Sequence, residues 1–282
     1  MNLVLLEDAL TRTLPAGTPA ATHLTHTLRL ARGDTFWCGV RNGTRGLATV
    51  RDIAPDGAVS FSVEWEKTVL LPPPISLLVG LSRPQTMKKV FALAAEIGCA
   101  RLDVFRSEKG EPSYAQSSLW KRGNRALDEI LESAAVQTCV PAIPDFALHE
   151  SLDAALAVRS RNAENSCGND AENSCRSAEK SSSRALGGRT EFRVALDVYE
   201  TAHPFAEIAF PSRANVVLAI GSERGWAPAE RERLRAGGFV FAHLGERVLR
   251  VETAVAVALA VAISKLPDAR TPHVPLSAPK KN

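Results

Sequence analysis

Glycines and charged residues gather in two short segments near the C-terminal end of the sequence. Residues 220–226 have the sequence IGSERGW, residues 244–254 have the sequence LGERVLRVETA, and each segment follows an apolar run. Glycines at the end of a strand let the backbone approach a ligand closely, and ligands of open α/β sheets bind beyond the carboxyl ends of the strands. The two segments therefore predict a site for a small ligand, contributed by two neighbouring strands.

Each segment taken alone also fits a plainer interpretation, in which Gly221, Gly225 and Gly245 only make turns. The G-x-x-x-G spacing is neither that of a dinucleotide-binding turn nor that of a P-loop, so neither signature supports pyrophosphate or triphosphate binding. The charged residues of the second segment could likewise form a solvated ion cluster. The residue types alone leave both interpretations open.

The elements that would position these segments alternate from residue 75 onward. Short apolar or β-rich runs predict strands at 75–81, 101–106, 193–199, 214–221 and 238–244. Helical patterns predict helices at 86–97, 119–138, 228–236 and 251–266. Strands that alternate with helices indicate an α/β fold with a mostly parallel sheet and helices on both faces.

Residues 1–71 have a different pattern and are expected to form a separate small β domain. Extended segments are predicted at 35–40, 46–53 and 58–65, with turn signals between them. Such spacing suggests a small barrel or sandwich. Three consecutive prolines at 72–74 form a stiff spacer and mark the boundary to a second domain over 75–266.

Two further segments are expected to lack fixed structure. Residues 160–190 contain no aromatic residue, isoleucine or valine, so they cannot bury enough apolar surface to offset their ordering entropy. We interpret them as a disordered insertion in a surface loop. The tail at 267–282 is rich in proline and is expected to be flexible. The alternating charges at 231–235 are typical of a solvated helix face.

Composition excludes several classes of protein. The 282 residues, 45% of them hydrophobic, are enough for two globular domains, and the net charge of +3 permits a nucleic-acid partner without demanding one.

The five cysteines form no C-x-x-C pair, and His23 and His26 have no acidic or cysteine residue beside them, so we expect no metal. The start of the chain lacks a signal-peptide pattern, and the longest apolar run, 254–263, is too short to span a membrane. We therefore expect a soluble, cytoplasmic protein without a membrane partner.

The two glycine segments together resemble the paired C-terminal loops of the SPOUT methyltransferases, and most closely the RsmE family of 16S ribosomal RNA uracil-N3 methyltransferases. That family's pattern is roughly I-G-P-E-G-G-[FW]-x-x-x-E followed by L-G-x-R-[IV]-L-R-x-E-T-A, which residues 220–230 and 244–254 match. Segments at 23–34, 94–98 and 132–141 also resemble its motifs. Ser222 and Arg224 depart from the family's proline and glycine, and Val140 departs from its arginine.

This resemblance implies a PUA-like β-barrel that binds RNA, followed by a trefoil-knotted α/β domain that acts as a homodimer, with the final helix among the contacts. It implies that the chain binds S-adenosylmethionine in a bent shape. The residues expected to hold this cofactor lie at strand ends and in the two loops: Leu196, Ile220, Gly221, Ser222, Glu223, Gly225, Leu244, Gly245, Val248, Leu249, Thr253 and Ala254.

The implied reaction moves the sulfonium methyl to uracil N3, which must shed its proton. A fixed cation could stabilise the negative charge that then spreads over the uracil oxygens. Arg250 is the first candidate for that role and Arg247 the second, while Glu252 could orient an arginine or accept a proton. For each arginine a structural ion pair is the alternative.

The small ribosomal subunit or its RNA is the expected partner. Arginines expected to contact RNA phosphates lie in the N-terminal domain and in the first glycine segment: Arg29, Arg32, Arg41, Arg45 and Arg224. Two other functions stay open. The chain could be an RNA-binding or ribosome-assembly factor that has lost catalysis, or it could methylate another RNA.

Overall fold

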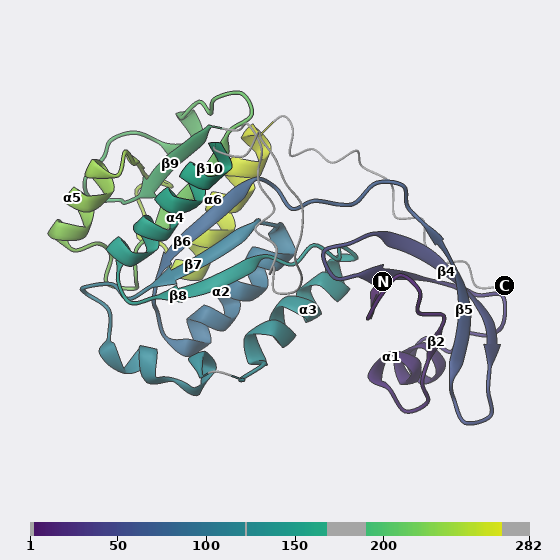
Figure 1. The fold of residues 1–282 in the computed structure, drawn as a ribbon. Helices are drawn as coiled ribbons and strands as arrows, with labels where there is room; N and C mark the ends of the chain where they lie inside the picture. Colours follow the sequence, from purple (N-terminus) through teal and green to yellow (C-terminus); the bar gives the residue numbers. More distant parts are fainter. Residues whose placement is uncertain (1–2, 122, 168–189, 267–282) are drawn as a thin grey trace.

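The computed structural model describes residues 3–121, 123–167 and 190–266, and these residues build two sheets (Figure 1). The first sheet has five strands from the N-terminal part of the chain. The second has six strands, all from residue 75 onward, and helices cover it. Both glycine segments follow strands of the second sheet.

The N-terminal sheet is open and mixed. Its order is β1 (Leu3–Leu6), β3 (Thr35–Val40), β4 (Arg45–Ile53), β5 (Val59–Trp65) and β2 (Thr13–Leu14). The β1–β3 pair is parallel and the other pairs are antiparallel. Helix α1 (Pro19–Thr22) continues into the π-helix η1 (His23–Thr27), which buries Leu24 in the core of this sheet. Phe36 and Phe61 meet edge to face in the same core, at 5.4 Å between ring centroids.

The second sheet is entirely parallel. Its order is β11 (Val240–Ala242), β9 (Glu191–Leu196), β10 (Asn215–Ile220), β6 (Ile75–Gly80), β7 (Arg101–Phe105) and β8 (Asp145–His149). Every neighbouring pair runs in the same direction. The expected α/β fold with a mostly parallel sheet is confirmed, and all six carboxyl ends lie at one edge of this sheet.

Helices cover both faces of the parallel sheet. Buried side chains of α2 (Pro84–Ile97), α3 (Ala126–Thr138) and α6 (Val251–Lys265) share one core, and those of α4 (Leu152–Cys167) and α5 (Pro228–Ala236) share the other. Side chains of β10 alternate between the two cores, with Leu218 in the first and Val217 and Ala219 in the second. Because neither face meets water, this strand can be apolar throughout. Short 3₁₀ turns complete the domain: η2 (Pro112–Gln116), η3 (Ser118–Trp120) and η4 (Phe205–Glu207).

Several predicted elements need correction. The helix expected at 119–138 begins only at Ala126, after an Asx turn in which the Asn124 side chain accepts the Ala126 N–H at 2.8 Å. Strand β8 and helix α4 were not predicted. Since α4 continues to Cys167, residues 160–167 are helical rather than part of a disordered insertion. Residues 168–189 and the tail at 267–282 lie outside the described residues.

A polar junction joins the turn between β3 and β4 to the end of α3. The Asn42 N–H donates to the Pro141 carbonyl at 2.8 Å, and the Asn42 side chain accepts the Ile143 N–H at 2.7 Å. Leu3, Trp37 and Cys139 form a small apolar cluster beside these bonds. The junction therefore ties the N-terminal sheet to the parallel sheet through both backbone and packing.

Candidate functional site

The two glycine segments begin at the same level of the parallel sheet. Leu196 of β9 is in register with Ile220 of β10 on one side and with Ala242 of β11 on the other. Strand β9 therefore lies between the two strands that carry the segments, which corrects the expectation that these strands are neighbours. Two strand spacings separate the segments by roughly 10 Å, so together they flank the end of β9.

The first segment, residues 220–226, is a closed and mostly buried turn. The Gly225 N–H donates to the Ser222 carbonyl at 2.8 Å, and the Ser222 hydroxyl bonds to Ser107 at 3.4 Å. A side chain at Gly80 would place its Cβ 2.5 Å from the Ser222 nitrogen. The end of β6 therefore packs directly on this turn. This close contact requires glycine at position 80, because any side chain there would overlap the turn.

Trp226 closes the turn against the sheet. Its side chain is 1% exposed, its indole N–H donates to the Leu196 carbonyl at 2.9 Å, and its ring stacks on Phe105 at 5.8 Å between centroids. The donated hydrogen bond links the end of β9 to the segment after β10. Trp226 therefore fixes the distance between two of the strand ends that frame the candidate site.

Glu230 is fully buried and bonds to the loops around it. Its carboxylate accepts the Ala227 N–H at 2.8 Å, the Glu108 N–H at 3.0 Å and the Ser107 hydroxyl at 3.2 Å. These bonds join the start of α5 to the loop after β7. The sequence pattern includes Glu230 as a motif residue, but its role as an anchor becomes visible only in the structure.

A buried ion pair holds the turn after β9. Arg231 of α5 lies 2.6 Å from the Asp197 carboxylate, and the Asp197 N–H donates to the Ala242 carbonyl at 2.9 Å. Arg231 is 8% exposed, so the interpretation of residues 231–235 as a solvated face is wrong at this position. Sequence reasoning did not find Asp197. The strand predicted at 193–199 included this residue, whereas β9 ends at Leu196, so no sequence signal indicated that Asp197 begins the turn.

The second segment is open by contrast. Gly245 has a φ of +117°, which favours glycine, and a Cβ at this position would meet no atom within 4 Å. Val248 is 70% exposed although it is apolar. Arg247 and Arg250 are exposed as well, and within the described residues neither is held in an ion pair. This segment thus presents both cations and an apolar side chain to its surroundings.

Glu252 is engaged elsewhere. Its carboxylate pairs with Lys89 of α2 at 3.2 Å rather than with either arginine, so the three charged residues do not form the solvated cluster considered above. A hydrogen bond from its own backbone N–H lowers the pKa of Glu252, and burial opposes this effect. The hydrogen bond and charge of Lys89 lower the pKa further, as does the more distant charge of Arg250. A carboxylate with a lowered pKa is a weak proton acceptor, which disfavours Glu252 as a base and favours an anchoring role.

The other expected cofactor residues lie around the same strand ends. Leu244, Leu249 and Ala254 are half-buried, and Thr253 is exposed at the start of α6. Glu223 instead turns toward α2, where it lies 3.5 Å from Arg83 and accepts the Thr86 hydroxyl at 3.1 Å. The structure therefore separates Glu223 from the second segment.

Arg224 lines a small hollow on the β6–β7 side of the first segment. The hollow is bounded by residues from three loops: Leu81, Lys109, Gly110, Glu111, Tyr114, Ser222, Glu223 and Arg224. Gly245 belongs to the opposite side of β10, beyond β9. Arg224 therefore lines the hollow on the side of the first segment that faces away from Gly245.

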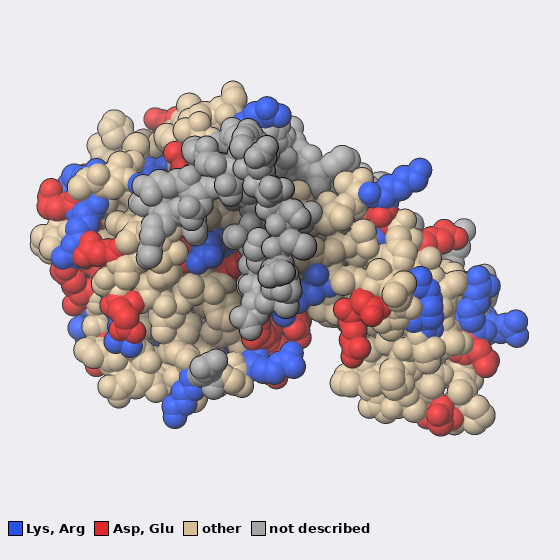
Figure 2. All heavy atoms as spheres, in the orientation of Figure 1, with Lys and Arg blue, Asp and Glu red and all other residues tan. Residues whose placement is uncertain are grey.

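The arginines expected to bind RNA fall into two groups. Arg29 and Arg32 are exposed on the N-terminal unit. Arg41 is half-exposed but pairs across the junction with Glu132 at 3.0 Å and Asp128 at 3.4 Å. Figure 2 shows basic and acidic side chains intermixed on the visible face, with no continuous basic stripe.

Arg45 is not available to RNA, and this expectation is wrong. Its side chain is 4% exposed, pairs with Glu66 at 2.7 Å and donates to the Cys139 carbonyl at 3.0 Å. The guanidinium also stacks over Trp37, 4.7 Å from the ring centroid. Arg45 therefore stabilises the junction between the two sheets.

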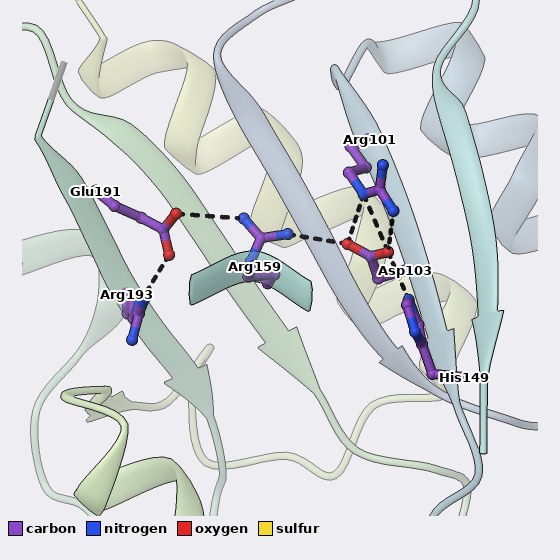
Figure 3. A network of polar contacts seen from close by, with 6 residues as sticks. All are labelled: Arg101, Asp103, His149, Arg159, Glu191 and Arg193. Atoms are coloured by element: carbon purple, nitrogen blue, oxygen red, sulfur yellow. Dashed lines mark hydrogen bonds and ion pairs between the residues drawn. The ribbon is translucent and has the colours of Figure 1, made fainter. Parts of the chain in front are cut away.

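A second polar cluster lies beneath α4 and has a structural role (Figure 3). Asp103 of β7 bonds to Arg101 at 2.9 Å, His149 at 2.8 Å and Arg159 at 3.0 Å, and its side chain is 1% exposed. Burial alone would raise the pKa of Asp103, but these partners hold it below its usual value. Arg159 continues the chain of contacts to Glu191 at 3.7 Å. Covered by α4, the cluster fixes this helix to the sheet.

Residues 3–121, 123–167 and 190–266 contain neither a metal-binding group nor a membrane-spanning helix. In these residues no group of three or more histidine, cysteine, aspartate or glutamate side chains could hold a metal ion. None of their helices combines the length and apolar character needed to cross a membrane.

The parallel sheet with paired loops at its carboxyl edge defines a ligand-binding α/β domain of the kind found in enzymes. The family model for the RNA methyltransferase domain matches residues 70–263, which include the whole parallel sheet and both glycine segments. The chain belongs to this RNA methyltransferase family.

Similar proteins point the same way. The chain is 28% identical over 248 residues to the ribosomal RNA small subunit methyltransferase E of Treponema pallidum, covering 86% of this chain and 81% of that protein. Its fold resembles a ribosomal RNA small subunit methyltransferase E from Neisseria gonorrhoeae bound to S-adenosyl methionine, with a TM-score of 0.68 and 20% identity over 94% of this chain and 98% of the other. A putative methyltransferase from Legionella pneumophila in complex with the same cofactor has a TM-score of 0.65 and 20% identity over 93% and 96% of the two chains.

Proposed function

We propose that this protein is an S-adenosylmethionine-dependent methyltransferase that methylates N3 of a uridine in 16S ribosomal RNA, in the decoding region. The observation that carries the proposal is the pair of glycine segments that flank the end of β9 at one level of the sheet. Membership of the RNA methyltransferase family, the name of the Treponema relative and the cofactor in the Neisseria structure support it.

The cofactor would bind beyond the end of β9, between the two segments. The buried turn at 220–226 offers a fixed backbone on one side, and the open segment around Gly245 offers backbone groups and the apolar Val248 on the other. Leu196, Ile220 and Leu244 would contact it from the strand ends. The activated methyl group is supplied by the cofactor when bound.

The protein's own contribution is alignment and charge stabilisation. Positioning uracil N3 in line with the methyl group removes most of the entropic cost of the reaction. Loss of the N3 proton puts negative charge on the uracil oxygens, and Arg250 is exposed and outside any ion pair in the described residues, so its guanidinium is available to them. Arg247 is the second candidate. Glu252, tied to Lys89, would anchor the start of α6 beside them.

The connection between β9 and β10 supports the proposal that residues 75–266 form a trefoil knot. His203 and Phe205 of this connection bond to the backbone of His243 just after β11. The Lys265 ammonium at the end of α6 donates to the Ala206 and Ile208 carbonyls of the same connection. The C-terminal segment thus meets the β9–β10 connection at both its start and its end, as expected if the chain passes through that loop.

The remaining parts of the proposal concern RNA and assembly. Residues 1–71 would be a PUA-like unit that docks RNA through Arg29 and Arg32, held in a fixed position by the junction.

Residues 253–264 of α6 carry no charge, and Thr253, Ala260 and Ser264 are exposed along the helix, which suits a homodimer interface. The protein would act in the cytoplasm, where ribosomes are assembled.

The proposal can be tested with purified protein, tritiated S-adenosylmethionine and small ribosomal subunits from a strain that lacks this methylation. We expect incorporation of label, and mass spectrometry of the ribosomal RNA nucleosides should identify N3-methyluridine. Retention of the cofactor without methylation of these subunits would point to another RNA. A folded protein that never retains the cofactor would instead support the RNA-binding or assembly factor.

A further inference from the structure

His243 lies where the β9–β10 connection meets the open glycine segment. Its N–H donates to the His203 carbonyl at 3.0 Å, and its carbonyl accepts the Phe205 N–H at 2.9 Å. These bonds fix the backbone of His243 directly after β11. Its half-buried side chain is therefore presented from a rigid position to the exposed residues that follow.

The imidazole bonds to the next turn of the chain. Its Nδ1 atom lies 3.1 Å from the Gly245 nitrogen, and a backbone N–H can only donate, so Nδ1 must be the acceptor. The hydrogen of a neutral ring then sits on Nε2, which faces the Ala202 carbonyl at 3.4 Å. Only the neutral ring with its hydrogen on Nε2 satisfies both contacts.

Gly245 needs this contact because its conformation is unusual. Its φ of +117° is one that residues other than glycine rarely adopt. The residues that follow it, Glu246, Arg247 and Val248, are exposed. The bond to His243 spans two residues and orients the peptide before Gly245. An imidazole that gains a proton on Nδ1 loses the acceptor and places a positive charge against the N–H.

We propose that His243 is a positioning residue, whose neutral imidazole holds the Gly245 peptide in the geometry that binds S-adenosylmethionine, so that protonation of His243 loosens the segment and weakens cofactor binding. The proposal rests on the proposed function for the identity of the cofactor. It assigns no contact between His243 and the reacting atoms. The other titratable and charged groups on the β9–β10 connection and the open segment are Asp197, Tyr199, Glu200, His203, Glu207, Arg213, Glu246, Arg247, Arg250 and Glu252. Asp197 and Glu200 are paired with Arg231, and Glu252 is paired with Lys89.

The test measures cofactor affinity at two pH values in four proteins. The dissociation constant of S-adenosylmethionine is determined by calorimetry at pH 8 and pH 5.5, which bracket the range where histidines ordinarily titrate. We expect the wild type to bind about fivefold more weakly at the lower pH, since one hydrogen bond contributes about 1 kcal/mol. His243→Ala should bind about fivefold more weakly at pH 8 and change less with pH.

Two further variants test whether the hydrogen bond of His243, rather than the charge of its ring or the protonation of another histidine, controls cofactor affinity. In His243→Asn the side-chain oxygen can accept the Gly245 N–H without titrating, so affinity at pH 8 should stay near wild type and its fall at pH 5.5 should shrink. His203→Asn, at an exposed histidine of the same junction, should keep both the affinity and the pH dependence of the wild type. Equal affinity of His243→Ala and wild type at pH 8, or loss of affinity in His243→Asn matching His243→Ala, would overturn the proposal.

A second readout does not depend on the cofactor. In nitrogen-15 NMR spectra of the free protein, the Gly245 amide signal, identified by its loss in Gly245→Ala, should shift as His243 titrates and should not do so in His243→Asn. A Gly245 amide that ignores the protonation of His243 would overturn the proposal whatever the cofactor does. A Gly245 amide that follows His243 in a protein that binds no S-adenosylmethionine would uphold the positioning contact and reject the proposed function.

Discussion

The two glycine segments at the carboxyl edge are built in opposite ways. The turn at 220–226 is buried except at Glu223, Arg224 and the half-buried Gly225, and it is packed against Gly80 and held by Trp226 and Glu230. The segment at 244–250 is exposed and is held by the His243 side chain. One is fixed by the protein's own core, whereas the other leaves its cations and Val248 uncovered.

This difference indicates a division of labour. A ligand that binds between the segments meets a rigid surface that is already in place and an adaptable surface that becomes ordered around it. Mutations in the first segment should therefore act mainly on folding, and mutations in the second mainly on binding and catalysis. The predictions below test this division, beginning with the largest expected effect.

Glu230→Ala should lower the free energy of unfolding by roughly 3–5 kcal/mol. The change leaves the Ala227 and Glu108 N–H groups and the Ser107 hydroxyl without their buried acceptor. Urea denaturation measures the effect. Glu232→Ala on the exposed side of the same helix should change stability by less than about 0.5 kcal/mol. Equal stability of the two variants would show that the first segment does not depend on its buried anchor.

Arg250→Ala should leave folding intact and lower the rate of methyl transfer about 100-fold, the cost typical of losing one group that stabilises developing charge. Cofactor affinity should change by less than about twofold, since Arg250 is assigned to the transition state. Single-turnover kinetics with calorimetry distinguish the two effects. Arg247→Ala serves as the matched comparison and should have a smaller effect on rate. Equal losses of rate and cofactor affinity in Arg250→Ala would indicate a structural role.

Gly80→Ala should lower stability by about 2 kcal/mol, because its Cβ would overlap the backbone of the first segment. Cofactor affinity should fall as well, since Ser222 would be displaced. Gly245→Ala is the counterpart in the open segment and should cost less stability, about 1 kcal/mol, because only its φ of +117° disfavours a side chain and a Cβ there meets no atom within 4 Å. Thermal unfolding compares the pair. A larger loss of stability in Gly245→Ala would reverse the contrast drawn between the segments.

Lys89→Met should have the smallest effect, about 0.5 kcal/mol, because the Lys89 side chain is 60% exposed. The pKa of Glu252 is lowered in the folded protein, so its stabilisation is present above the unfolded pKa and is lost as the pH falls through the folded one. Lys89→Met should therefore reduce stability at pH 7 and reduce the loss on acidification below pH 4.5. A variant with an unchanged pH profile would show that Lys89 does not contribute to the lowered pKa.

The periodic parts of the fold could be predicted from sequence, and the tertiary roles could not. Strand β3 and helix α5 have the predicted bounds, because an extended-type run followed by a turn signal and the proline at the helix start are local signals. Strand order is not local, so the position of β9 between β10 and β11 was missed. For the same reason Arg45 was assigned to RNA and Arg231 to solvent. A charged residue is predicted to be exposed unless its buried partner, here Glu66 or Asp197, is known in advance.

The same distinction between local and tertiary signals applies to the candidate site. Its glycines were found because their spacing after apolar runs is a sequence property. Trp226 and Glu230 belong to the sequence motif, but their supporting roles were not predicted, because they bond to residues at least 30 positions away in the chain. The role of His243 depends on a backbone conformation that the sequence does not specify.

A crystal structure of the protein with S-adenosylmethionine tests the central claim most directly. The two segments are predicted to hold the cofactor between them, with its density beyond the end of β9 and in contact with both Gly221 and Gly245. Density for the cofactor in the hollow beside Tyr114 and Arg224, with Gly245 untouched, would contradict the account.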